Sequence, residues 1–181
     1  VLLLYLASSF FINEGSSVIY PMNTIFAVSA AQLTQEQVVV AMLINRVTAV
    51  GWCLLWLALF RADVEAISCY AAAVVATLGA GLLCCVLSAS WEYTLLQLCL
   101  ACAGTGTFAC GRSILSSLTP PGMSAQVFGF YSTVNRSAGS FGPLLFGLVV
   151  DWTGDEHSGF RVVLVFFVIG IWLLTLVDVR A

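Results

Sequence analysis

Long apolar stretches separated by short polar connections dominate the chain. A helix that crosses a bilayer needs about 20 mostly apolar residues, and six stretches of that kind can be marked. They cover roughly residues 1–30, 37–60, 66–87, 93–118, 125–151 and 160–177. The connections are short and polar, with the Gly, Pro and Ser content of turns. The pattern therefore predicts an all-α polytopic membrane helix bundle of six transmembrane helices, with sequential helices antiparallel.

Composition supports this prediction. Of the 181 residues, 61% are hydrophobic and only 8% are charged, and the mean hydropathy is +1.04. Ordinary soluble domains carry about 25% charged residues, so the partner that we expect for this surface is the lipid bilayer. The six basic residues are all arginines and form no basic patch, so nucleic acid is not an expected partner.

The arginines near the span ends predict an orientation. If six helices alternate, Arg61, Arg112 and Arg180 share one side, and of the arginines near span ends only Arg161 lies on the other, acidic side. Arginine is enriched in cytoplasmic loops. We therefore expect the first three arginines to lie on the cytoplasmic side.

Three ionisable residues lie well inside the predicted spans, each directly after an asparagine: Asn13–Glu14, Asn45–Arg46 and Asn135–Arg136. An arginine at mid-membrane costs roughly 2.5 kcal/mol or more on insertion scales, and such residues usually mark a pathway or a binding site. Two arginines against one glutamate leave excess positive charge, which favours an anionic ligand group. A carboxylate suits this role because the guanidinium fork binds it bidentately.

Other roles for these residues stay open. Glu14 could form an internal salt bridge with Arg46 or Arg136 that holds the bundle together, or it could carry a coupling proton. Arg112 lies near a predicted helix end, where its side chain can reach the interface. A role in topology or gating is therefore favoured over substrate binding for Arg112.

Glycine and proline predict irregular backbone in two spans. Gly15 and Pro21 predict a broken or kinked first helix, and such helices line the binding sites of transporters. Gly104-Thr105-Gly106 in the fourth span and Gly139 with Gly142 in the fifth span could also permit bending.

Catalytic and cofactor chemistry is not expected. All seven cysteines lie inside predicted spans, and the Cys99–Cys102 spacing lacks a second pair or a histidine cluster, so they are interpreted as packing residues. The single histidine, His157, is expected to be a solvated loop residue. No nucleophile–base pair is visible, so neither an enzyme nor a cofactor or metal site is predicted.

Several motifs together resemble a known family. They are Gly111-Arg112-Ser113, the Pro120-Pro121-Gly122 turn, Phe128-Gly129-Phe130-Tyr131, Arg136-Ser137 and the run from Gly142 to Gly147. They resemble the fourth and fifth helices of the C-terminal half in the vacuole effluxer family, typified by autophagy-related protein 22, within the major facilitator superfamily. Tyr5 with Asn13-Glu14-Gly15 is similar to the family's seventh-helix motif, where the acid is usually aspartate. The loop at residues 61–65 departs from the basic loops common in facilitators.

This resemblance implies a twelve-helix transporter with two six-helix halves and alternating access. The chain would be the C-terminal half, residues 1–181, with the N-terminal half absent, and Val1 opens without a methionine as a fragment would. The resemblance implies efflux of small solutes, plausibly amino acids released by autophagy, with proton coupling as a further expectation. The membrane would be vacuolar in a eukaryote and the plasma membrane in a bacterium.

Two sets of residues follow for this hypothesis. Substrate binding or coupling is expected at Asn13, Glu14, Arg46, Asn135 and Arg136. Gating or topology is expected at Gly15, Arg112, Gly142 and Pro143. The alternative is a non-transporting six-helix membrane scaffold or receptor, in which the same charges only lock the bundle.

Overall fold

The computed structural model describes residues 1–29, 32–61, 64–85 and 90–177. Arg180, which entered the orientation prediction, lies outside them. The described residues are all-α, and their seven helices are α1 (Leu2–Ser29), α2 (Gln35–Arg61), α3 (Ala66–Cys84), α4 (Ser90–Leu118), α5 (Ser124–Ser137), α6 (Phe141–Thr153) and α7 (Glu156–Thr175).

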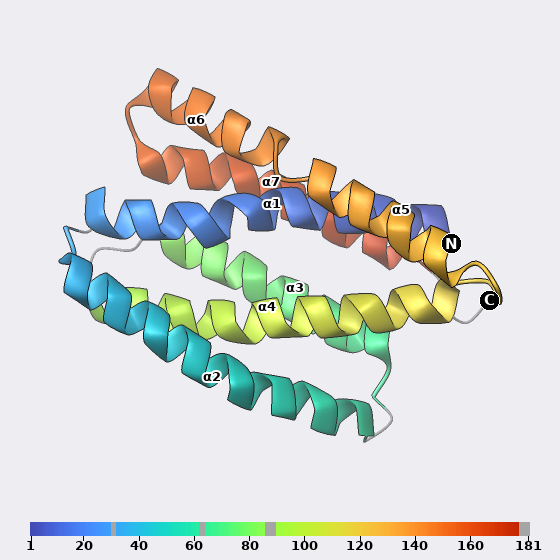
Figure 1. Ribbon diagram of the computed structural model, residues 1–181. Helices are drawn as coiled ribbons and strands as arrows, with labels where there is room; N and C mark the ends of the chain where they lie inside the picture. The colour runs from blue at the N-terminus through green and yellow to red at the C-terminus, as the bar shows by residue number, and fades with distance from the viewer. Residues whose placement is uncertain (30–31, 62–63, 86–89, 178–181) are drawn as a thin grey trace.

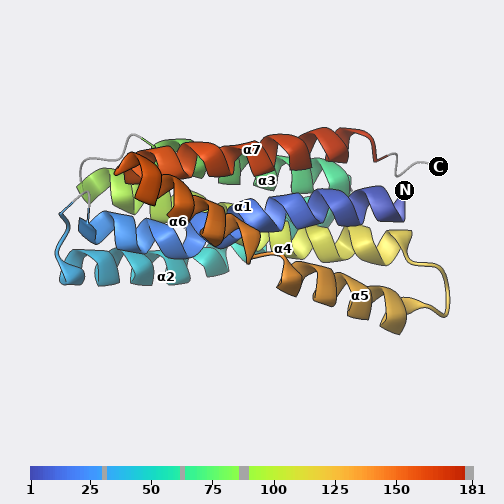
Figure 2. The same cartoon turned by 90° about the horizontal axis from the view of Figure 1, so that it is seen from above.

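The helices run roughly along one common direction, with α4 near the middle (Figure 1). α4 packs along α2 and α3, α1 packs along α7, and α7 also contacts α3 and α6. Figure 2 shows α5 and α6 following one another at an angle on the outside of this bundle. The cleft described below lies between α1, α2, α4 and α5.

Five of the helices, α1, α2, α3, α4 and α7, are long and apolar enough to cross a membrane. They correspond to five of the six predicted spans, which confirms the helical class and most of the span positions. Boundaries differ by a few residues; for example, α7 begins at Glu156, four residues before the predicted start.

The predicted break in the first span is wrong, because α1 is one continuous helix across Gly15 and Pro21. Proline has no N–H and so removes one hydrogen bond of the helix. Nearby polar side chains bind the backbone on both sides of this gap. Ser17 Oγ donates to the carbonyl oxygen of Glu14 (2.7 Å), and Asn23 Nδ2 donates to those of Ile19 (2.6 Å) and Tyr20 (2.7 Å).

The break lies instead in the fifth span. α5 ends at Ser137 and α6 begins at Phe141, and Gly139 between them has a φ of +105°. Glycine reaches this left-handed region without the penalty that a Cβ brings. At 14 and 13 residues, the two helices are each about 20 Å long, shorter than the roughly 30 Å hydrocarbon core. Together they replace the single helix that hydropathy predicted.

α1 and α7 approach closely because small residues lie at their contact. A Cβ on Gly15 would collide with the ring of Phe167, and one on Gly170 would lie 2.6 Å from Ile12 Cγ1. Ser8 Oγ donates to the carbonyl oxygen of Gly170 at 2.8 Å. Small residues and interhelical hydrogen bonds hold helices together in lipid, so Gly15 serves packing on α7.

α7 begins with a capped turn. Asp155 is the N-cap, and its carboxylate accepts from the backbone N–H groups of His157 and Ser158, both at 3.1 Å. The Ser158 hydroxyl also donates a hydrogen bond to this carboxylate, and that bond is the main cause of the lowered pKa of Asp155. The prediction that His157 is a solvated loop residue is wrong. His157 lies half-buried in the first turn of α7, and the centroid of its ring lies 4.8 Å from that of Phe26, with the rings edge-on.

We predict that Gly170→Ala in the full-length protein lowers the free energy of unfolding by about 1–3 kcal/mol, because the added methyl overpacks the α1–α7 contact. Thermal unfolding in detergent measures this. Gly147→Ala is the matched control, since a Cβ at Gly147 meets nothing within 4 Å. Equal melting temperatures for the two variants would contradict the prediction.

Candidate functional site

A stripe of polar side chains runs along the face of α1 that looks toward the cleft. Its members recur every three or four residues, the spacing of one helix face: Ser9, Asn13, Ser16, Ser17, Tyr20, Asn23 and Thr24. Gly15 lies off this stripe, against α7. α1 therefore packs with one face and lines the cleft with another.

One part of the cleft is a cavity of about 200 Å³ between α1, α3, α4 and α5. Its polar lining consists of hydroxyls and amides only: Ser9, Asn13, Ser16, Ser17, Tyr20, Tyr70, Thr107, Tyr131 and Asn135. We call it the smaller cavity. The structure thus brings together two of the predicted site residues, Asn13 and Asn135, from α1 and α5.

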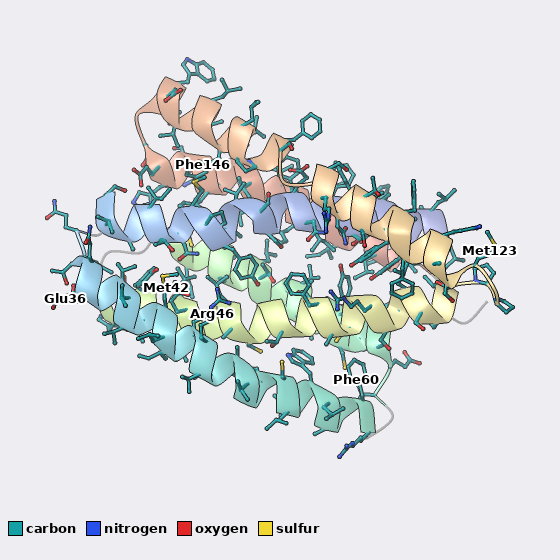
Figure 3. The ribbon with its side chains drawn as sticks, viewed as in Figure 1. Glu36, Met42, Arg46, Phe60, Met123 and Phe146 are labelled. Carbon is teal, nitrogen blue, oxygen red and sulfur yellow. The ribbon has the colours of Figure 1, made fainter. Side chains whose placement is uncertain are left out.

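A cavity of about 690 Å³ adjoins it between α1, α2 and α4. Tyr20, Gly104 and Phe108 line both cavities and form their junction. This larger cavity contains Arg46 and Arg112 in its lining, and no acidic residue lines it among those that the structure describes. Figure 3 shows Arg46 directed from α2 toward α4.

The two arginines lie toward different ends of the larger cavity. Asn45, the neighbour of Arg46, contacts Gln97 on α4, whereas Arg112 lies fifteen residues further along the same helix. At 1.5 Å per residue this corresponds to about 22 Å along α4. The prediction that Arg112 serves topology or gating is not tested, but its place on the cavity lining next to Phe108 was not foreseen.

A network of amides and one phenol fixes the end of the larger cavity near Arg46. Gln97 Nε2 donates to Asn23 Oδ1 (2.9 Å) and to Tyr93 Oη (2.7 Å). Asn45 Nδ2 donates to the Gln97 carbonyl oxygen (2.7 Å) and to its Oε1 (3.1 Å). The network joins α1, α4 and α2, and it positions Arg46 one residue beyond Asn45.

Glu14 lies outside the cavity lining, fully buried at 0% exposure. Its Oε2 accepts a hydrogen bond from the backbone N–H of Gly142 at 2.7 Å, in the first turn of α6. A carboxylate at a helix N-terminus is favoured by the unpaired N–H groups and by the helix dipole. Oε1 has no partner among the described residues. Within that part of the chain Glu14 therefore holds α6 and pairs with neither Arg46 nor Arg136.

Gly142 and Pro143 complete this contact. A Cβ on Gly142 would lie 2.5 Å from the Glu14 carbonyl oxygen and 2.9 Å from Val18 Cγ2, so only glycine allows the approach. Pro143 lies in the first turn of α6, where a backbone N–H would have no acceptor within the helix. The missing N–H of proline therefore costs α6 no hydrogen bond.

Arg136 lies in the last turn of α5, exposed, beside the break rather than in the middle of a helix. A cation in the last turn of a helix interacts favourably with the dipole. It does not line either cavity, although its neighbour Asn135 does.

Several cleft residues escaped the sequence analysis, chiefly Tyr20, Asn23, Gln97 and Thr107. A signal was available in α1, where polar residues recur at helical spacing from Ser9 to Thr24. On α4 the signal is weaker, since Gln97 and Thr107 are isolated among apolar neighbours.

Helices that are long and apolar enough to cross a membrane, with a polar cleft between them, are typical of membrane helix bundles. Comparison with known proteins gives the family: its model, described as "Vacuole effluxer Atg22 like", matches residues 1–181. The chain belongs to this Atg22-like vacuole effluxer family.

Individual relatives match part of the chain. Autophagy-related protein 22-2 of Aspergillus niger is 32% identical over 88 residues, which are 49% of this chain and 15% of that protein. Autophagy-related protein 22 of Yarrowia lipolytica is 32% identical over 90 residues, 50% of this chain and 15% of the relative. The Cryptococcus neoformans protein of that name is 35% identical over 69 residues, 38% of this chain and 13% of the relative. No solved structure matches the chain.

We predict that Glu14→Ala destabilises the full-length protein by roughly 2–3 kcal/mol, because a buried N–H loses a charge-assisted hydrogen bond. Glu14→Gln keeps an acceptor oxygen and should lose less. Thermal unfolding in detergent distinguishes the two, with the exposed Glu36→Ala as control. A Glu14→Ala protein that melts with the wild type would disprove the capping role.

Proposed function

We propose that the chain is the C-terminal six-helix half of a secondary-active transporter that exports small anionic or zwitterionic solutes, amino acids among them, by alternating access. The observation that carries this proposal is the larger cavity, with Arg46 and Arg112 in its lining. Among the described residues neither guanidinium has a carboxylate partner, so both are available to a ligand.

The charge of the cleft supports the substrate class. An arginine that faces a cavity in lipid is stabilised when an anion neutralises it, and its planar fork matches a carboxylate. The volume of about 690 Å³ lies within the range of about 300–1,000 Å³ typical of small-molecule sites. A substrate carboxylate thus has both room and opposite charge.

Exposed apolar surface supports the proposed missing half. In α2, only Val38, Ala41 and Trp56 are buried, and in α5 only Val127. Both helices border the cleft, and Figure 1 shows α2 at the edge of the bundle. An N-terminal half that covers the open side of the cleft would place the site between the two halves, as in facilitators built from repeats.

The family suggests the cellular setting. We place the transporter in the vacuolar membrane if its source is eukaryotic, in line with the name of the family, and in the plasma membrane if the source is bacterial. Proton coupling is part of the proposal, with Glu14 as its candidate because this carboxylate is buried and has one unpartnered oxygen.

We predict that at least one of Arg46→Gln and Arg112→Gln reduces amino-acid transport by the full-length protein in vesicles at least tenfold, whereas Arg161→Gln does not. Arg161 is an exposed arginine of α7 outside both cavities, so it controls for loss of charge alone. Loss of one carboxylate–guanidinium contact, worth about 1.5–3 kcal/mol, gives this magnitude.

Cys53 provides an independent readout, because it is exposed and lines the larger cavity. A transported amino acid should slow alkylation of Cys53 by a maleimide, and the protection should disappear in the arginine variant that loses transport. A Cys53→Ser protein identifies labelling at the other cysteines. Normal transport in both arginine variants would disprove the assignment, and stable folding without transport of any amino acid in the wild type would favour a scaffold or receptor.

A further inference from the structure

The amides of the network between α1, α4 and α2 can take only one orientation. An amide side chain has a donor end and an acceptor end. Asn23 Nδ2 donates to the carbonyl oxygens of Ile19 and Tyr20, which leaves its Oδ1 as the acceptor. Gln97 therefore presents Nε2 to Asn23 and Oε1 to Asn45. Asn45 in turn must present its Nδ2 to α4, so contacts that begin on α1 fix the side chain of a residue on α2.

Asn45 is the polar attachment of a part of α2 that is otherwise largely unburied. No residue of α2 between Ala41 and Trp56 is buried, and these fifteen residues of helix correspond to about 22 Å. Within this stretch, among the described residues, only Asn45 forms a side-chain hydrogen bond to another helix. Its partners are the Gln97 carbonyl oxygen at 2.7 Å and Gln97 Oε1 at 3.1 Å. These two hydrogen bonds therefore favour one rotation of the stretch toward α4.

That rotation determines where Arg46 points. Successive residues of a helix are about 100° apart, so the direction of Asn45 dictates that of Arg46. Arg46 shares the lining of the larger cavity with Ala49 and Cys53, three and seven residues later, which are positions on the same helix face. Figure 3 shows the Arg46 side chain directed toward α4. A different rotation of α2 would consequently turn Arg46 away from the cavity.

We propose that Asn45 is the positioning residue that holds the Arg46 guanidinium in the larger cavity, where it binds the anionic group of a transported solute. The proposal rests on the proposed function and specifies which contact prepares its site. A site whose residues already face the ligand loses less free energy to ordering when the ligand binds. Loss of the Asn45 side chain should therefore weaken anion binding through Arg46, without any contact between Asn45 and the ligand.

The position of Arg46 can be tested without a ligand, through a reporter on α4. Thr105 lines the larger cavity and lies eight residues beyond Gln97, about 12 Å along the helix. Thr105→Cys is introduced into the full-length Cys53→Ser protein, and its rates of modification by anionic sulfonatoethyl and cationic trimethylammonioethyl methanethiosulfonate are measured. A guanidinium in the cavity raises the ratio of the anionic to the cationic rate. Arg46→Gln and Asn45→Leu should each lower this ratio roughly threefold.

Trp56→Phe is the matched control, because Trp56 Nε1 also donates from α2 to a carbonyl oxygen of α4, that of Cys102 at 3.1 Å. It removes a hydrogen bond between the same two helices and should leave the rate ratio unchanged. The combination of Asn45→Leu with Arg46→Gln should lower the ratio no further than Arg46→Gln alone, since both remove the same charge from the cavity. Asn45→Ala gives the same comparison if Asn45→Leu does not fold. An unchanged ratio in a folded Asn45 variant would overturn the proposal.

Transport kinetics separate positioning from direct contact with the ligand. Radiolabelled L-glutamate and L-leucine serve as probes in vesicles. We expect Asn45→Leu to raise KM about fivefold and to leave the maximal rate within twofold, because it weakens binding, and to add nothing to the effect of Arg46→Gln. An unchanged KM would overturn the proposal, and effects that multiply in the double variant would show that Asn45 acts independently of Arg46 and overturn its positioning role. A wild-type protein that transports neither probe would contradict the proposed function, whereas the rate ratio tests the role of Asn45 separately.

Discussion

The hydrogen bond from Gly142 to Glu14 is the contact on which the arrangement of this bundle depends. A membrane helix that stops in mid-span exposes N–H groups with no water to satisfy them, and each such group costs several kcal/mol in lipid. Glu14 meets that need for α6 from the middle of α1. The missing side chain of Gly142 lets the two backbones come close enough, and so the break in the fifth span and the position of α6 on α1 are fixed together.

α1 carries out three tasks because its faces differ. Gly15 meets α7, Glu14 holds the start of α6, and the polar stripe that includes Asn13 and Tyr20 lines the cleft. The lining of the cleft differs between its two parts. Hydroxyls and amides line the smaller cavity, and the larger cavity has Arg46 and Arg112 in its lining.

The helical class and most spans could be predicted from the sequence because lipid leaves a strong hydropathy signal over 20 residues. The location of the break could not be predicted, since Gly15 and Pro21 carry a stronger local signal for a helix break than Gly139. Pro21 nevertheless does not break α1, and polar side chains bind backbone carbonyls near it. Hydropathy likewise cannot show toward which neighbour a side chain points. Arg46 and Asn135 face the cleft, whereas Arg136 and Glu14 do not. Those differences depend on rotation about each helix axis, and the tertiary packing sets that rotation.

The division of the fifth crossing into α5 and α6 has a mechanical consequence. α6 is attached to α1 through Glu14 and to α7, where a Cβ on Gly159 would collide with Phe146. α5 packs mainly on α1, with Val127 as its one buried residue. The fifth crossing therefore consists of two segments that meet at Gly139. α6 is held by α1 and α7, whereas α5 lies beside the cleft with little of its surface buried.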